Sequence, residues 1–359
     1  MKTHAAIAFS PDTPLEIREV DLADPGPGEV RVKMQACGIC RSDLSALEGK
    51  ETVEFPVVLG HEGAGIVDAV GTGVTRVQDA DRVVLSWTPA CGICPGCLRG
   101  EYQLCERVNM STGSQGPLTL NGRGLDRFMA LGAFCEYVVV PERMAIPVHS
   151  EMSAVHICLI GCGITTGFGA AVNTAAVRWG ESVAVFGCGG VGLAAIQGAR
   201  VAGAASIIGV DPIAQRRAAA LRVGATAVLD PRGAVKKILA DTLGGVDVAI
   251  ECVGNPATMA DAFNVIRSGG RSIVVGLPAY TEMLELPAIM LLREKSIKGS
   301  IYGSSNPSVD FQKIASLGDR GLLQFEPLVD NTRHFSEINE GIAEMREGSV
   351  TRVVLTFQN

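Results

Sequence analysis

The chain has 359 residues, more than a single hydrophobic core usually organises, so two domains are expected. Hydrophobic residues make up 47% of the chain and charged residues 19%, a balance that excludes intrinsic disorder. The formal net charge is −7 and no basic stretch is present, which argues against a nucleic-acid-binding protein, because such proteins neutralise phosphates with Lys and Arg.

No segment has the length and uniform apolarity of a transmembrane helix, which needs about 20 such residues. The apolar run at 157–172 is interrupted by glycines and hydroxyl side chains. The opening residues, MKTHAAIAFS, show no charged segment followed by an apolar one, so no secretion signal is expected. We therefore expect a cytoplasmic protein without membrane association, whose 11 cysteines are reduced.

Residues 1 to about 150 contain short β-like segments separated by Pro and Gly. Apolar and polar residues alternate within these segments, as in strands that bury one face. The segments lie at 15–20, 29–38, 63–71, 81–87 and 134–142. This pattern predicts a barrel-like, mostly antiparallel β domain.

From about residue 165 to residue 302 the pattern changes to alternating strands and helices. The strand-like segments lie at 182–187, 206–211, 246–254 and 271–277, with helical segments at 191–203 and 214–225. Such alternation is typical of a doubly wound parallel sheet, so the expected fold class is α/β. The remainder, from about 303, ends in the strand-like TRVVLTF, and we expect it to rejoin the first domain.

Four cysteines lie within fifteen residues, in the pattern C-x2-C-x2-C-x7-C. This spacing lets one loop supply all four thiolate ligands of a tetrahedral zinc ion, each at about 2.3 Å. A disulfide framework would need an oxidising compartment, of which the sequence gives no sign. We therefore predict a structural zinc site formed by Cys91, Cys94, Cys97 and Cys105, without an open position for a substrate.

A dinucleotide-binding fingerprint follows the first strand of the second domain and opens a helix. It comprises Gly187, Gly189, Gly190, Val191 and Gly192. Glycines let the backbone approach a pyrophosphate at the helix N-terminus, and Asp211, at the end of the next strand, would bind both ribose hydroxyls. Because this carboxylate would repel a 2′-phosphate, NAD is favoured over NADP. Arg216 either contacts the ribose or a phosphate, or is a solvated residue of the helix surface.

Three further segments contain residue types that bind zinc in catalytic sites. They are Cys40-Arg41-Ser42-Asp43, Gly60-His61-Glu62 and Gly161-Cys162-Gly163. A single Cys is more often a small buried residue, and a single His is more often a hydrogen-bonded core residue. Together, however, two thiolates and an imidazole describe a Cys2His zinc site with one open position, where the ion acts as a Lewis acid on an alcohol or carbonyl oxygen.

In their order along the chain, these motifs resemble those of the zinc-dependent alcohol dehydrogenases of the medium-chain dehydrogenase/reductase superfamily. The resemblance extends from GEVRVKMQACGICRSD to TRVVLTF, so it covers essentially the whole chain. It implies a GroES-like catalytic domain of residues 1–163 and 303–359, with a structural-zinc lobe at about 88–110. It also implies a Rossmann NAD-binding domain of residues 164–302.

The resemblance assigns roles to residues of the catalytic site. Cys40, His61 and Cys162 would hold the catalytic zinc. Glu62, beside the metal, would be a transient ligand. Asp43 would fix the tautomer of His61, as carboxylates behind metal-binding histidines do. Ser42 would hydrogen-bond the reacting oxygen and take the first step of proton removal.

For the cofactor, the resemblance places Arg41 and Arg352 at the pyrophosphate. Thr166 and Val191 would lie against the nicotinamide, with Val275 in the same site. For Arg352 the alternative is a surface charge on an edge strand.

One departure from the best-known members concerns residue 45, where they carry a histidine that passes the proton to solvent and this chain has Ser45. The proton route is therefore expected to be shortened or to run through water. The remaining histidines are expected to be surface or hydrogen-bonded residues; they are His4, His149, His156 and His334. Trp87 either walls the substrate pocket or is a core residue.

The expected reaction is reversible hydride transfer between an alcohol, which we expect to be primary, and NAD+, giving an aldehyde or ketone. Two zinc ions per chain are expected. A thiol-adduct formaldehyde dehydrogenase of the same family is an alternative. So are a zinc-free quinone-reductase relative and a zinc-binding module without enzymatic activity. The expected assembly is a homodimer joined through residues 286–303, with a tetramer as the alternative.

Overall fold

The computed structural model describes residues 1–88, 90–106, 116–348 and 350–357. Within it the chain forms two compact units. The first unit comprises Met1–Cys162 and Asn306–Asn359, and the second unit comprises Gly163–Ser305. Part of the predicted zinc lobe, residue 89 and residues 107–110, lies outside the described residues.

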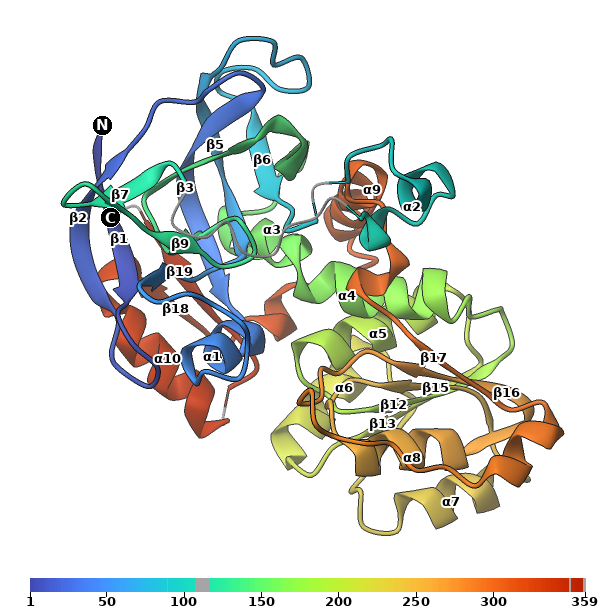
Figure 1. Cartoon of the computed structure of the whole chain (residues 1–359). Coiled ribbons are helices and arrows are strands. Elements are labelled where there is room, and N and C mark those ends of the chain that lie inside the picture. The colour runs from blue at the N-terminus through green and yellow to red at the C-terminus, as the bar shows by residue number, and fades with distance from the viewer. Residues whose placement is uncertain (89, 107–115, 349, 358–359) are drawn as a thin grey trace. The chain divides into compact units, whose positions relative to one another are not determined.

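The first unit consists mainly of two β-sheets (Figure 1). Their strand orders are β8-β7-β2-β1-β4-β9 and β11-β6-β5-β3-β19-β18, with β10 paired to β3. The strands are β1 (Lys2–Ala8), β2 (Glu16–Leu22), β3 (Glu29–Ile39), β4 (Val57–Val58), β5 (Glu62–Val70), β6 (Arg82–Leu85), β7 (Leu118–Leu120), β8 (Arg123–Gly124), β9 (Asp126–Arg127), β10 (Tyr137–Pro141), β11 (Ala145–Pro147), β18 (Asn331–His334) and β19 (Val353–Thr356). Apart from β4–β9 and β18–β19, the pairs are antiparallel. The predicted mostly antiparallel domain is therefore confirmed.

Short helices fill the connections of the first unit. They are α1 (Arg41–Leu47), α2 (Pro95–Leu98), η1 (Tyr102–Leu104), η3 (Glu142–Met144), α3 (Ala154–Ile157), η4 (Cys158–Gly161), α9 (Pro307–Asp319), η8 (Glu326–Leu328), η9 (Phe335–Glu337) and α10 (Ile338–Glu347). The C-terminal strand β19 pairs antiparallel with β3, with Val353 opposite Ile39 and Thr356 opposite Ala36. Segments more than 300 residues apart in the sequence therefore form one sheet.

The second unit has a parallel sheet with the order β14-β13-β12-β15-β16-β17, which confirms the predicted doubly wound fold. Its elements are α4 (Gly163–Gly169), η5 (Ala170–Thr174), β12 (Ser182–Phe186), α5 (Gly190–Val201), β13 (Ser206–Val210), α6 (Ala214–Val223), β14 (Ala227–Leu229), α7 (Ala234–Asp241), β15 (Val246–Glu251), α8 (Pro256–Asn264), β16 (Ile266–Val274), η6 (Ala288–Arg293), β17 (Ser296–Gly299) and η7 (Tyr302–Ser304). Helices α5 and α8 cover opposite faces of the sheet (Figure 1).

The central strands of this sheet are apolar almost throughout, because helices cover both of their faces. Phe186, Val210, Ile238 and Phe263 belong to one buried cluster that joins the strands to α7 and α8. In the described part of the chain, no single helix is long and apolar enough to cross a membrane. Only the bent pair Ala154–Gly161 and Gly163–Thr174 passes that test together.

Candidate functional site

The structure brings Cys40, His61, Glu62 and Cys162 together in the first unit. One potential ligand atom from each of these residues lies within 4.8 Å of the other three. All four side chains are buried, with His61 and Glu62 fully so. Two thiols, an imidazole and a carboxylate at this spacing form a donor set that suits zinc.

Local backbone geometry places these residues. Cys40 follows β3 and caps the N-terminus of α1, whereas His61 and Glu62 lie where the chain enters β5. Gly60 precedes them with a φ of +93°, and a Cβ on it would lie 2.6 Å from the backbone nitrogen of Phe134. Only glycine allows His61 to be presented from this tight turn.

Asp43 organises the cluster from behind. Its carboxylate accepts hydrogen bonds from Cys40 N at 2.9 Å, from Gly60 N at 3.0 Å and from His61 Nδ1 at 2.9 Å. Because Nδ1 then carries the proton, Nε2 keeps its lone pair. In the described residues this buried Nε2 has no hydrogen-bond partner, which is the state expected of a metal ligand. The cluster therefore fits a zinc ion.

Arg352, directly before β19, is buried and contacts the same cluster. Its Nη1 lies 3.2 Å from Glu62 Oε2 and donates to Ile39 O at 2.9 Å. The alternative of an edge-strand surface charge is therefore wrong. Burial raises the pKa of Glu62 to about 8, although the charge of Arg352 opposes that rise. A hydrogen bond from Cys162, aided by the charge of Arg352, lowers the pKa of Cys40.

The other predicted residues of this site lie on or near α1. Ser42 is half-buried, and its Oγ is 3.8 Å from Cys40 Sγ. Ser45 lies on the next turn of α1 and is also half-buried. Arg41 is exposed, with its guanidinium 3.9 Å from Glu48. Trp87 follows β6 and is buried, as either of its two expected roles requires.

The four cysteines at 91–105 form a second cluster, in which one Sγ from each residue lies within 4.8 Å of the others. Cys94 Sγ and Cys105 Sγ are 3.9 Å apart. A tetrahedron with Zn–S bonds of about 2.3 Å has S–S edges of about 3.8 Å, whereas a disulfide bond measures about 2.05 Å. This cluster therefore fits four-coordinate zinc.

Backbone N–H groups point at the sulfurs of this cluster. Cys91 Sγ accepts from Ile93 N at 3.5 Å and from Cys94 N at 3.3 Å, and Cys94 Sγ accepts from Cys97 N at 3.5 Å. Such bonds favour the thiolate, and they lower the pKa of Cys94 to about 6. Burial instead raises the pKa of Cys97 to about 12.

In the second unit, the glycine-rich segment joins β12 to the twelve-residue helix α5. A Cβ on Gly192 would lie 1.8 Å from Gly187 O, so this turn requires glycine there. Nothing lies within 4 Å of the position that a Cβ of Gly189 would take, so the backbone there is open to a ligand. The turn and helix N-terminus thus have the form of a pyrophosphate site.

Asp211 follows β13 beside this turn. Its carboxylate accepts from Cys188 N and from Ile213 N, both at 2.8 Å, and it keeps further lone pairs for ribose hydroxyls. The expected ribose or phosphate contact of Arg216 stays a prediction. The neighbouring Arg217, which the sequence analysis did not single out, donates to Asp211 O at 2.6 Å. Thr166, Val191 and Val275 are each half-buried.

Comparisons with known proteins agree with this geometry. Residues 26–150 match the alcohol dehydrogenase GroES-like domain, and residues 190–319 match the zinc-binding dehydrogenase family. A putative alcohol dehydrogenase D of Mycobacterium tuberculosis is 38% identical over 99% of this chain and 100% of its own length. The chain belongs to the zinc-dependent alcohol dehydrogenase family.

An S-(hydroxymethyl)glutathione dehydrogenase of Escherichia coli is also 38% identical, over 99% of this chain and 100% of its own length. Among solved structures, benzyl alcohol dehydrogenase from Acinetobacter calcoaceticus has a TM-score of 0.94 and 31% identity, with both chains covered completely. As a member of this family the protein is an oxidoreductase that acts on alcohols. The alternative of a zinc-binding module without enzymatic activity is therefore wrong.

Proposed function

We propose that the protein catalyses reversible hydride transfer between a primary alcohol and NAD+, at a zinc site formed by Cys40, His61 and Cys162. The observation that carries this proposal is the buried convergence of their donor atoms with that of Glu62 within 4.8 Å. Zinc held there would act as a Lewis acid on the alcohol oxygen, and the nicotinamide would accept the hydride.

The protein's own side chains would then orient the site and move the proton. Asp43 holds His61 in the tautomer that presents Nε2 to the metal. Ser42, beside Cys40, accepts the proton of the alcohol hydroxyl. Because residue 45 is a serine, we assign the further transfer of this proton to solvent to water molecules rather than to an imidazole. Arg352 pairs with Glu62. It would hold the Glu62 carboxylate beside the three proposed zinc ligands, and this carboxylate would act as a transient fourth ligand.

We assign the dinucleotide to the second unit, with its pyrophosphate at Gly187–Gly192 and its ribose at Asp211. Both oxygens of Asp211 already accept backbone N–H groups, so the carboxylate is fixed in place. A 2′-phosphate would meet this carboxylate, which supports NAD as the cofactor. Arg41 and Arg352 remain our candidates for further contacts to the pyrophosphate.

We further propose two zinc ions per chain. The second would be held by Cys91, Cys94, Cys97 and Cys105, where four thiolates leave no position for a substrate. Its role would be to hold together a segment that has only the short helices α2 and η1 of its own in the described residues.

A thiol-adduct alcohol is the second candidate substrate. The relative named S-(hydroxymethyl)glutathione dehydrogenase favours it, because that protein matches this chain over essentially its full length. The zinc chemistry would be the same in both cases. Only the part of the pocket that recognises the remainder of the substrate would differ.

We also propose a homodimer formed through the β17 edge of the parallel sheet. The segment beside this edge exposes large apolar side chains, including Ile289, Leu291 and Leu292, which are 65%, 53% and 81% exposed. Such patches mark interfaces. Leu292→Glu should shift the dimer to monomer in light scattering coupled to size-exclusion chromatography. The exposed Leu243→Glu, outside this segment, should not, and an unchanged dimer in Leu292→Glu would argue against this interface.

The test of the proposed function combines metal analysis with a substrate screen. We expect about two zinc ions per chain and NADH formation with primary or aromatic alcohols. A strong preference for S-(hydroxymethyl)glutathione would select the second candidate. A protein that binds about one zinc ion and forms no NADH with any alcohol of the screen would contradict the proposal.

A further inference from the structure

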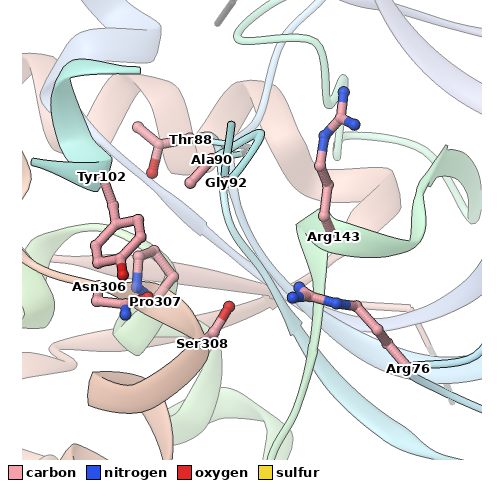
Figure 2. A pocket seen from close by; sticks show the side chains of 9 residues that line it. All are labelled: Arg76, Thr88, Ala90, Gly92, Tyr102, Arg143, Asn306, Pro307 and Ser308. Atoms are coloured by element: carbon pink, nitrogen blue, oxygen red, sulfur yellow. The ribbon is translucent and has the colours of Figure 1, made fainter. Parts of the chain in front are cut away.

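The first unit contains a cavity of about 160 Å³ that none of the predicted zinc or cofactor residues lines (Figure 2). Two arginines, Arg76 and Arg143, lie in its wall. Tyr102, Asn306 and Ser308 add a phenol, an amide and a hydroxyl. The cavity therefore offers several hydrogen-bond donors and has two arginines in its wall.

A single carboxylate holds the two arginine-bearing segments together. Glu142 Oε2 accepts from Thr75 N at 2.8 Å and from Arg76 N at 2.9 Å, and Glu142 directly precedes Arg143. These backbone hydrogen bonds, with the charge of Arg76, lower the pKa of Glu142, so its carboxylate is ionised. Within the described ranges, neither guanidinium forms an ion pair or a hydrogen bond, although the charge of Arg76 acts on the Glu142 carboxylate.

The opposite wall is the beginning of α9, a thirteen-residue helix. Asn306 is its N-cap residue and makes no side-chain capping bond, and Ser308 lies in the first turn. The N-terminus of a helix carries partial positive charge, which Asp310 offsets in part by accepting from Asn306 N. In Figure 2 the guanidinium of Arg76 points in the direction of Ser308, whereas that of Arg143 points away from Arg76 and Ser308. Arg143 is exposed, and its guanidinium would have to adopt another rotamer to contact a ligand in the cavity.

We propose that this cavity binds a small oxyanion, either a carboxylate or a phosphate group. Guanidinium and hydroxyl groups are the donors that such anions prefer. The cavity volume of about 160 Å³ is enough for one such group. The anion is either a free metabolite or the distal end of an alcohol substrate.

One wall of the cavity depends on the four-cysteine cluster. Ala90 and Tyr102, which line the cavity, also pack against Cys94, Cys97 and Cys105. The zinc site predicted there therefore shapes the anion site. Removing its metal should weaken anion binding.

Calorimetric titration of the full-length, zinc-loaded protein with inorganic phosphate and with succinate tests the binding itself, without turnover. We expect binding above that of sodium chloride at equal ionic strength, and at least about tenfold weaker binding in Arg76→Gln/Arg143→Gln, since two charge-assisted contacts are lost. Arg123→Gln removes an exposed arginine elsewhere in the unit and should change nothing. Zinc content and melting temperature verify folding, and Arg76→Lys serves if the double variant does not fold.

A kinetic arm distinguishes the two sources of the anion. It compares ω-hydroxycarboxylates of increasing length with primary alcohols of equal length. If the anion belongs to the substrate, the double variant loses about tenfold in kcat/KM for one length of hydroxycarboxylate and nothing for its neutral counterpart. If the anion is a free metabolite, phosphate or succinate binds but both kcat/KM values stay unchanged. If wild type and double variant had equal anion affinities and equal kcat/KM values, the proposal would be overturned, whether or not the protein oxidises alcohols.

Discussion

Replacing Asp43 with asparagine should weaken the catalytic zinc site without unfolding the protein. Asp43 accepts three hydrogen bonds, of which Oδ1 takes those of Gly60 N and His61 Nδ1 and Oδ2 takes that of Cys40 N. Asparagine keeps one oxygen and adds an N–H2 group. In its better orientation the oxygen replaces Oδ1, and the new donor then faces the N–H of Cys40.

The size of the expected loss in zinc affinity follows from this one contact, in which two N–H donors face each other. An unpaired buried donor costs about 1–3 kcal/mol, which is about 5- to 150-fold in an equilibrium constant. Groups that orient metal ligands typically change affinity or activity by about 10- to 100-fold, which is the same range. We therefore expect a loss of about 10- to 100-fold in affinity for one of the two zinc ions.

Zinc content per chain, measured by mass spectrometry in buffers of graded free zinc, separates the two sites. In Asp43→Asn one zinc ion should dissociate at a free zinc concentration about 10- to 100-fold higher than in wild type, while the other ion is retained. Asp126→Asn is the matched control, because Asp126 is equally buried and accepts from Glu54 N and Arg127 N. If Asp43→Asn kept both ions as wild type does, or if the control lost zinc equally, the assigned role of Asp43 would be wrong.

Three further substitutions address the other predicted sites. Cys40→Ala should abolish NADH formation while circular dichroism and NAD binding stay as in wild type; retained turnover would contradict the catalytic zinc assignment. Cys97→Ser should lower the melting temperature by several degrees, since a loss of about 1 kcal/mol shifts it by a few degrees in a protein of this size. A variant of normal stability that has lost only turnover would argue against a structural role. Asp211→Gly should raise kcat/KM for NADP relative to NAD by at least about tenfold, and an unchanged ratio would show that other contacts choose the cofactor.

The fold class was predictable because its signals are local. Alternating strands such as β3 and β5, and the strand-turn-helix of β12 and α5, each occupy one continuous stretch of sequence. The two- and three-residue strands were not predicted, since β4 and β9 are too short to show any period. Pairing was not predictable in detail, because register depends on partners far away in the chain.

For the metal cluster too, local sequence signals were predictable and contacts between distant segments were not. Cys40, His61 and Cys162 were recognisable by residue type and by the glycines beside them, and the structure brings them together. The contact of Arg352 with Glu62 was missed, because 290 positions separate the two residues and neither neighbourhood marks an ion pair. Burial of Arg352 follows from the pairing of β19 with β3, which is a property of the folded sheet.

That pairing also sets an order of events during synthesis on the ribosome. Strand β3, which leads into Cys40, is made early but gains β19 as its neighbour only after residues 353–356 have been translated. The second unit, a continuous stretch from Gly163 to Ser305, is complete by then. A nascent chain can therefore finish its parallel sheet first, whereas the arginine beside Glu62 is translated only afterwards. A chain truncated before Arg352 would leave the Cys40 strand without this partner and Glu62 without its counter-charge.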